Sequence, residues 1–309
     1  MIKAVMYHYV REYDQNVPYF RYLDIGDFRK QLTYFEDKFG FVTRSEWEDF
    51  VAFGKMPPED GKVLLTFDDA MSCHYEYVFP ELMNRGLWGL FYVPSQPYLE
   101  SKMLDVHRIH LLCGRYKGED LLTCILDLIN PKMIPYNKIK EFNAKPYLNQ
   151  DNYNGVSEFK RVLNYFVHPE YQSDLVDQVT SSFPINGVDD QFYVNPSSLL
   201  DMSKNGMVIG AHSHSHNVMS KLDYEEQKLD IHKSLEFVAK FKTGQGGSYC
   251  HPYGGFHSFD QNTLKVLNEL NVDYSFNVEP RDIVKKDHID SKHSLPRYDC
   301  NSFPYGTAS

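Results

Sequence analysis

The chain has 309 residues, of which 42% are hydrophobic and 24% are charged, an ordinary globular composition with enough length for one large α/β domain or two smaller ones. The formal net charge is −10 and the sequence contains no basic block, which argues against nucleic acid and anionic membranes as partners. No apolar stretch approaches transmembrane length, so we expect no membrane span.

The cysteines indicate the compartment. They are five in number, widely spaced and free of any Cys-x-x-Cys pair. This usage argues against a disulfide framework and a thiolate zinc site, and it fits a reducing environment. The sequence from Met1 to His8 lacks the apolar region of a signal peptide and has the pattern of a strand. We therefore expect a cytoplasmic protein.

Strand and helix patterns alternate along the first 95 residues. The predicted elements are a strand at 2–7, a helix at 24–39 ending at Gly40, a helix capped by Ser45 and Glu48, a strand at 63–67, a helix with Pro80 in its first turn, and a strand at 87–93. Residues 95–195 break this rhythm, because they lack clear strand patterns and carry a helical pattern over 103–129. We interpret them as an insertion near the active-site face of a single catalytic domain spanning 1–309.

The alternation resumes after residue 195. The predicted elements are a helix from Asn195 to Gly206, a strand at 207–211, a helix capped by Asp223 and Glu226, a strand at 247–250, a helix capped by Ser258, a strand at 272–278 and a last segment from Ser294. Alternating strands and helices predict a parallel sheet, here long enough to close into a barrel.

Two adjacent acids, Asp68 and Asp69, follow the strand at 63–67. The apolar run before them predicts a strand buried on both faces, at whose end carboxylates are costly unless they are compensated. Parallel α/β folds place their chemistry at the carboxyl ends of strands. The two acids are therefore candidate site residues. The alternative is a helix N-cap followed by an acid in the first turn.

Three histidines, His212, His214 and His216, follow the strand at 207–211. The spacing of His212 and His216 brings two imidazoles to one side of a turn, as metal binding requires. Together with a carboxylate they would make three protein ligands, the pattern of a catalytic Zn²⁺ site. The alternative is a solvated polar turn.

These stretches resemble motifs of the polysaccharide deacetylase family, also called the NodB-homology or carbohydrate esterase 4 family. The matching motifs are Thr66-Phe67-Asp68-Asp69-Ala70, His212-Ser213-x-x-His216 and Pro252-Tyr253-Gly254, with Tyr7-His8 on the first strand. The resemblance covers roughly 1–95 and 195–300. It implies an α/β fold, a distorted (β/α)7 barrel of the NodB-homology type with a largely helical insertion, and metal-dependent removal of acetyl groups from amino sugars.

The resemblance also implies a role for each matched position. These roles are general base for Asp68, metal ligand for Asp69, His212 and His216, and oxyanion binding by the backbone N–H at Tyr253, after Pro252. One divalent ion is expected, with Zn²⁺ favoured by the two imidazoles and Co²⁺, Ni²⁺ or Mn²⁺ as alternatives. The expected partner is a small saccharide or glycan substrate.

The chain departs from the family pattern at three places. Ala70 replaces a glycine, which we interpret as a position of ordinary backbone conformation. Cys250 and His251 stand where many members carry an arginine that pairs with the base, and Arg297 stands where many carry the general-acid histidine. A guanidinium does not deprotonate in proteins, so Arg297 cannot be the acid.

We therefore predict that Arg297 holds Asp68 through two parallel hydrogen bonds. A histidine elsewhere then supplies the proton to the leaving amine. His251 is the first candidate, and His214 and His8 are the alternatives. For His8, a structural role and a place in the site are both open.

The predicted function is a metal-dependent hydrolase that removes an acetyl group from an N-acetylated sugar, an intermediate of surface-polysaccharide or glycan biosynthesis. One alternative is the same site acting on an O-acetyl ester or a non-sugar amide. Another is a non-catalytic carbohydrate-binding barrel. The intact acid pair argues against the latter, because a binding protein needs no base beside a metal ligand.

Overall fold

A computed structural model of the chain describes residues 1–144, 155–185, 187, 191–241 and 247–308. The chain divides into two compact units. The barrel unit consists of Met1–Glu12, Tyr22–Lys102 and Gln191–Ser309, and the helical unit of Tyr13–Arg21 and Met103–Asp190. The range predicted as an insertion, 95–195, thus has its central part in the helical unit and both ends in the barrel unit. Its placement near the active-site face stays a prediction.

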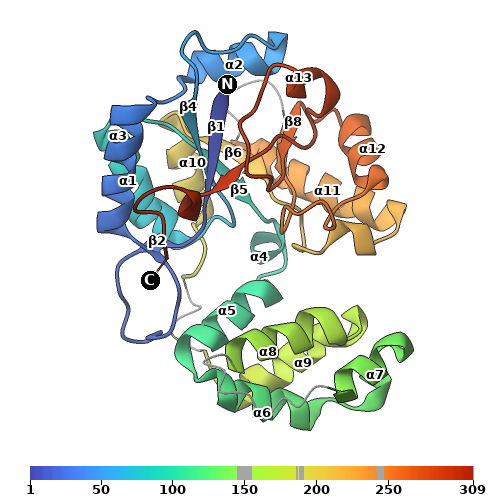
Figure 1. Cartoon of the computed structure of the whole chain (residues 1–309). Helices are drawn as coiled ribbons and strands as arrows, with labels where there is room; N and C mark the ends of the chain where they lie inside the picture. The colour runs from blue at the N-terminus through green and yellow to red at the C-terminus, as the bar shows by residue number, and fades with distance from the viewer. Residues whose placement is uncertain (145–154, 186, 188–190, 242–246, 309) are drawn as a thin grey trace. The chain divides into compact units, whose positions relative to one another are not determined.

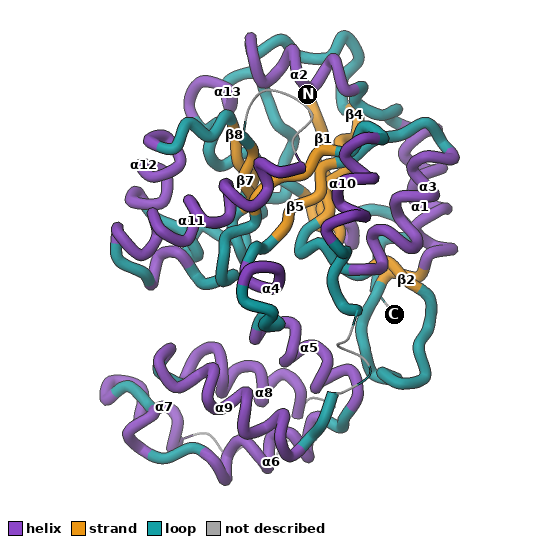
Figure 2. Tube along the Cα trace, turned by 180° about the vertical axis from the view of Figure 1, so that it is seen from behind, coloured by secondary structure: helices purple, strands orange, loops and turns teal. Residues whose placement is uncertain are grey.

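A sheet of seven parallel strands forms the centre of the barrel unit (Figures 1 and 2). The strands are β1 (Ile2–Tyr7), β4 (Lys62–Phe67), β5 (Leu90–Val93), β6 (Val208–Ala211), β7 (Ser248–Cys250), β8 (Tyr274–Phe276) and β9 (Tyr298–Asp299). Their order across the sheet is β8-β7-β6-β5-β4-β1-β9, and every pair is parallel, as the alternation predicted. A second, small sheet pairs β2 (Val10–Arg11) with β3 (Leu23–Asp24).

The segment before β9 joins the two edges of the large sheet. Leu295 forms a parallel bridge with Phe276 of β8, and its N–H donates to the carbonyl of Ser275 at 2.8 Å. Three residues later, Tyr298 of β9 pairs with Val5 of β1, at the other end of the strand order. The sheet therefore curls into the distorted (β/α) barrel that the family resemblance implied.

Helices surround the strands of the barrel unit in both views (Figures 1 and 2). They are α1 (Ile25–Lys38), α2 (Arg44–Phe53), the π-helix η1 (His74–Val78), α3 (Phe79–Asn84), α4 (Gln96–Leu99), α10 (Pro196–Lys204), η4 (Met219–Lys221), α11 (Tyr224–Val238), η5 (Ala239–Phe241), α12 (Gln261–Glu269), α13 (Asp287–Asp290) and η6 (Cys300–Ser302). The elements of the helical unit are α5 (Asp105–Arg115), α6 (Gly118–Leu128), η2 (Pro131–Met133), α7 (Tyr136–Ala144), α8 (Gly155–Arg161), η3 (Val162–Phe166) and α9 (Pro169–Ser182). Among the described residues, no helix combines the length and apolar character needed to cross a bilayer.

Two predicted helix caps are displaced by two residues. The capping box of α2 is formed by Thr43 and Glu46, not by Ser45 and Glu48. Both pairs have the Ser/Thr-x-x-Glu spacing, so the pattern alone does not choose between them. The helix after β7 is likewise capped by Asp260, two residues beyond the predicted position.

The strand that leads to the two acids is buried on both faces, as predicted. From Val63 to Phe67 the side chains are at most 1% exposed. Phe67 stacks on Tyr7 of β1 and on Phe91 of β5, with ring centroids 5.2 and 4.7 Å apart. This packing fixes β4 between its neighbours and therefore fixes where the acids that follow it emerge.

Candidate active site at the carboxyl ends of the strands

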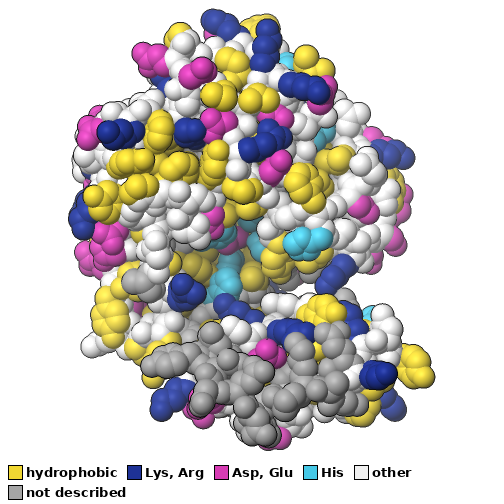
Figure 3. All heavy atoms as spheres, viewed as in Figure 1, with side chains coloured by type: hydrophobic (Ala, Val, Ile, Leu, Met, Phe, Trp, Pro, Cys, Tyr) yellow, Lys and Arg dark blue, Asp and Glu magenta, His cyan; other side chains and the backbone are white. Residues whose placement is uncertain are grey.

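The predicted site residues follow the ends of neighbouring strands or precede the last one. They are His8 after β1, Asp68 and Asp69 after β4, His212 and His216 after β6, His251, Pro252 and Tyr253 after β7, and Arg297 directly before β9. Because the carboxyl ends of parallel strands share one edge of a sheet, the segments that follow the strands meet at one rim of the barrel. Arg297 precedes its strand, but its side chain reaches Asp68 at this rim. On the face shown in Figure 3, histidine side chains gather in one place.

Asp69, His212 and His216 converge. Oδ1 of Asp69 lies 3.3 Å from Nε2 of His212 and 3.3 Å from Nε2 of His216, and all three side chains are buried. Their ligand atoms lie within 4.8 Å of one another. One carboxylate oxygen and two imidazole nitrogens form the donor set of a catalytic zinc site. The residues present therefore fit one divalent ion.

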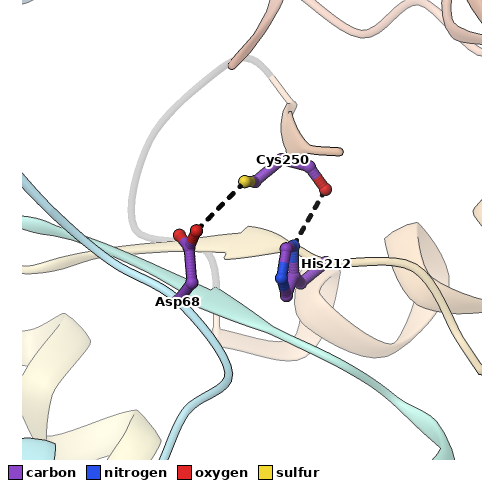
Figure 4. A group of neighbouring side chains, drawn as sticks. All are labelled: Asp68, His212 and Cys250. Carbon is purple, nitrogen blue, oxygen red and sulfur yellow. Dashed lines mark hydrogen bonds between the residues drawn. The ribbon is translucent and has the colours of Figure 1, made fainter. Parts of the chain in front are cut away.

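The tautomer of His212 suits a ligand. Its Nδ1 lies 2.9 Å from the carbonyl oxygen of Cys250 (Figure 4). A carbonyl can only accept, so Nδ1 carries a hydrogen, and Nε2, the atom that faces Asp69, is the one that could offer a lone pair to an ion. Such a hydrogen bond behind a histidine fixes the ring and strengthens the nitrogen as a ligand.

A second group of potential ligands, Asp68, His212 and Cys250, suits an ion less well (Figure 4). The thiol of Cys250 lies 3.5 Å from Oδ2 of Asp68 and 2.9 Å from Nη2 of Arg297. Burial raises the pKa of this thiol, although Arg297 opposes the shift. A guanidinium against both ligand atoms disfavours a cation here, so the group with Asp69 is the better candidate.

Arg297 holds Asp68 in the geometry that the sequence predicted. Nη1 donates to Oδ1 and Nη2 donates to Oδ2, both at 2.8 Å, and the two residues are 1% and 2% exposed. Nη1 also donates to Oγ of Thr66 at 3.0 Å, and Nε to the carbonyl of Asn277 at 3.2 Å. The guanidinium is therefore oriented from three directions, and its fork matches the carboxylate.

The pKa of Asp68 reflects this partner. Burial alone would raise it, because a charged carboxylate loses its hydration. The charge and hydrogen bonds of Arg297 overcome burial and lower the pKa to about 2, with a smaller contribution in the same direction from His212 and His8. Asp68 is therefore ionised at neutral pH.

His251 does not suit the predicted role of general acid. Its side chain is 1% exposed and stacks on Phe259, with ring centroids 4.0 Å apart. Its Nε2 lies 2.9 Å from the carbonyl of His293, to which it can only donate. Burial lowers the pKa of His251 to about 3, so the ring is neutral at physiological pH and lacks the second, acidic proton of an imidazolium that a general acid would donate. The structure thus speaks against this prediction.

The physical reason is the alternation of side chains along a strand. Cys250 points into the barrel toward Asp68, so the next residue points to the opposite face, where Phe259 covers it. The family resemblance located the motif Pro252-Tyr253-Gly254, but it did not indicate which of the two residues before the motif, Cys250 or His251, faces the site.

The other two histidines differ in their surroundings. His214 is held at both ring nitrogens, by Oγ of Ser95 and by Oε1 of Glu100, each at 2.9 Å. His8 is partly exposed, and its backbone carbonyl lies 2.6 Å from Nε2 of His74, on the π-helix η1. His74 is not among the residues that the sequence predicted for the site, although it contacts one of them. A π-helix, which often marks functional sites, was not visible in the pattern of side chains.

The backbone is strained around this rim. Asp69, Ala70, Ser213, His216 and Tyr253 all have positive φ, between 50° and 78°. Non-glycine residues in this region cost free energy and persist where the surrounding structure fixes them, often at functional sites. The prediction of an ordinary conformation for Ala70 is wrong, because its φ is 50°. The family's glycine at that position has a conformational reason.

Comparisons with known proteins agree with this architecture. Residues 176–275, which include both candidate histidine ligands and Tyr253, match the family model described as polysaccharide deacetylase. No curated protein matches the sequence. Among solved structures, the deacetylase PplD of Streptococcus pyogenes, in complex with acetate, is 13% identical with a TM-score of 0.58, covering 96% of this chain and 91% of that one.

Two further structures have the same fold. IcaB of Ammonifex degensii is 16% identical with a TM-score of 0.55, covering 96% of this chain and 91% of that one. A de-N-acetylase of Aggregatibacter actinomycetemcomitans is 13% identical with a TM-score of 0.50, covering 96% and 94%. The family model therefore supports the resemblance to polysaccharide deacetylases over residues 176–275, and the solved structures show the same fold.

Proposed function

We propose that the protein is a metal-dependent hydrolase that removes an acetyl group from an N-acetylated sugar of surface-polysaccharide or glycan biosynthesis. One observation carries the proposal: Asp69, His212 and His216 converge within 4.8 Å, and the next carboxylate, Asp68, is held ionised by Arg297. A non-catalytic carbohydrate-binding barrel has no use for a buried base beside a ligand cluster. The de-N-acetylase of the same fold supports an amide as the bond attacked.

In this proposal Asp69, His212 and His216 hold one divalent ion, with Zn²⁺ first and Co²⁺, Ni²⁺ or Mn²⁺ as alternatives. Bound there, the ion would supply a Lewis acid that lowers the pKa of water and polarises the acyl oxygen. The burial of these three side chains supports tight binding of the ion, because few water molecules compete with the ion for buried ligand atoms.

Asp68 is the general base in this mechanism. With a pKa of about 2 it is ionised but only weakly basic. Such a base can take the proton of a water only where that water has itself been made acidic. The low pKa of Asp68 is therefore compatible with catalysis beside the three ligands. Arg297 keeps both carboxylate oxygens oriented.

His8 is the proposed general acid, which donates a proton to the leaving amine. It is partly exposed at the end of β1, and its imidazole lies close enough to influence the pKa of Asp68. The two other candidates are engaged elsewhere, His251 against Phe259 and His214 with Ser95 and Glu100. Tyr253, whose ring centroid is 5.0 Å from that of His216, remains the candidate for oxyanion binding through its backbone N–H.

We expect His8→Asn to lower turnover of an N-acetyl substrate by about 10²–10⁴-fold and to remove the basic limb of the pH–rate profile. Hydrolysis of an O-acetyl ester should be slowed less, because an alkoxide leaves more readily than the amide anion that would leave if no proton were donated to the nitrogen. His251→Gln is the control, since it changes a buried neutral ring and should keep the basic limb. A His8→Asn enzyme with an unchanged profile would exclude this acid.

The substrate class is tested by measuring acetate released from a panel of N-acetylated sugars, nucleotide sugars and lipid-linked sugars, with matched O-acetylated compounds. Release from an N-acetylated sugar supports the proposal. Release only from the esters or from non-sugar amides would favour the alternative chemistry at the same site. Binding of sugars by the metal-loaded protein without any acetate release would favour the non-catalytic alternative.

A further inference from the structure

The loop between the two candidate histidine ligands has an unusual backbone. Ser213 and His216 have φ values of 62° and 55°, in the left-handed region that side chains rarely adopt. Inside the loop, the N–H of His216 donates to Oγ of Ser213 at 2.8 Å. One internal hydrogen bond does not offset the cost of two such conformations. Other groups must hold the loop.

Asp230, on α11, makes the contacts that do this. Its Oδ1 accepts from the backbone N–H of His214 at 2.7 Å. Its Oδ2 accepts from the backbone N–H of Ser215 at 3.0 Å and from Oγ of Ser215 at 2.5 Å. The side chain is buried, with 6% of its surface exposed. Hydrogen bonds to a buried carboxylate are among the stronger ones in proteins. Three of them therefore stabilise the conformation of this short loop.

The element that carries Asp230 is itself well fixed. A capping box of Asp223 and Glu226 starts α11, and the helix packs on β6, the strand that His212 follows. On the other side of the loop, the ring of His214 contacts Ser95 and the half-exposed Glu100. The main chain is held on that side too, because the backbone N–H groups of Ser95 and Gln96 donate to the carbonyls of Ser213 and His214 at 3.2 and 3.0 Å. Asp230 holds the loop from the other side through its side chain, at the backbone N–H groups of two consecutive residues.

We propose that Asp230 is a positioning residue, which sets the loop so that His212 and His216 face Asp69 before any ion is bound. This inference rests on the proposed function, because it assumes that these three residues bind the ion. Without Asp230 the loop would relax, and part of the binding free energy would be spent on restoring the strained conformation. The affinity for the ion would fall although every ligand is still present.

The test compares dissociation constants for Zn²⁺, measured by competition with a chromophoric chelator, in the wild type and two variants. Asp230→Ala should bind Zn²⁺ about 10–100-fold more weakly. Asp230→Asn should lie between it and the wild type, because it keeps one acceptor oxygen but turns an NH₂ group toward a donor. The absorption spectrum of bound Co²⁺, which reports ligand geometry, should change in the same order.

The matched control is Asp223→Ala. This carboxylate is on the same helix and also accepts a backbone N–H, that of Glu226 at 2.9 Å, but it does not contact the loop. The variant should lower the denaturation midpoint of the metal-free protein, because it removes a helix cap, and should keep the wild-type affinity for Zn²⁺. If Asp230→Ala does not fold, the test uses Asp230→Asn alone, because the asparagine side chain has nearly the same size as the native one.

Each outcome separates the inference from the proposed function. Wild-type affinity in both Asp230 variants overturns the inference and leaves the metal site intact. An equal loss of affinity in Asp223→Ala also overturns it, because the effect then comes from the stability of the helix. A wild-type protein that binds no Zn²⁺ and no Co²⁺ overturns the proposed metal site and this inference with it.

Discussion

Asp68→Asn is expected to remove most of the turnover while the divalent ion stays bound. The amide cannot accept a proton from water, and a positioned base contributes about 10²–10⁴-fold to such reactions. The proposed ligands Asp69, His212 and His216 are unchanged in this variant. The measurement is kcat for acetate release together with metal content of the same sample.

The neighbouring carboxylate provides the control for this change. Asp69→Asn should lose both the ion and the activity, because it removes an anionic ligand. The two variants differ by one position in the chain and should differ in metal content. Full activity in Asp68→Asn, or an equal loss of metal in both variants, contradicts the separate roles of the two acids.

Arg297→Ala is expected to shift the acidic limb of the pH–rate profile to higher pH. In the folded protein the pKa of Asp68 is about 2, below its ordinary value of 3.8, because Arg297 outweighs the effect of burial. Once the guanidinium is removed, burial prevails and the pKa rises. The carboxylate is then protonated, and inactive as a base, at a higher pH. Arg297→Lys should bring the acidic limb only part of the way back to the wild-type pH, because lysine keeps the charge without the two parallel hydrogen bonds.

The same pair also predicts how stability depends on pH. Because the folded-state pKa of Asp68 is lowered, its contribution to stability is complete above the unfolded value and is lost as the pH falls through the folded one, between about 4 and 2. Arg297→Ala removes this contribution and leaves a buried carboxylate unpaired, at a cost of about 3–5 kcal/mol in the free energy of unfolding.

A second arginine–aspartate pair is the matched control for Arg297. Arg281 donates to both oxygens of Asp287, at 2.8 and 2.9 Å, but its side chain is 39% exposed. Arg281→Ala should therefore cost less stability and leave the acidic limb in place. An acidic limb in Arg297→Ala that coincides with that of the wild type contradicts the assignment of Arg297 as the partner of Asp68.

Much of the site could be predicted because its chemistry lies in short, continuous stretches of sequence. An apolar strand followed by Asp68 and Asp69 can be recognised in the sequence, and so can a strand followed by three closely spaced histidines. Parallel strands bring such ends to one rim whatever the details of the packing. The contact between Arg297 and Asp68 followed from charge, since a buried base without its usual partner needs another cation.

The features that could not be predicted depend on the direction in which a side chain points and on tertiary contacts. The sequence does not show toward which face of β7 the side chain of His251 points. A shift of one residue along the strand moves a side chain from the site to the opposite face. The positive φ of Ala70 is set by the chain around it and contradicts the local preference of alanine. Asp230 is an ordinary helical acid in the sequence, and only the fold brings it to the loop between the histidines.

The most direct test of the proposed function is acetate release from an active N-acetylated sugar as Zn²⁺ is added to the metal-free protein. The account predicts that release rises to a plateau near one equivalent of Zn²⁺ per chain and is abolished again by a chelator. The variant His216→Ala, which lacks one ligand, should stay inactive in the same titration. Acetate release that is equally fast without the ion, or a His216→Ala titration that coincides with that of the wild type, would contradict it.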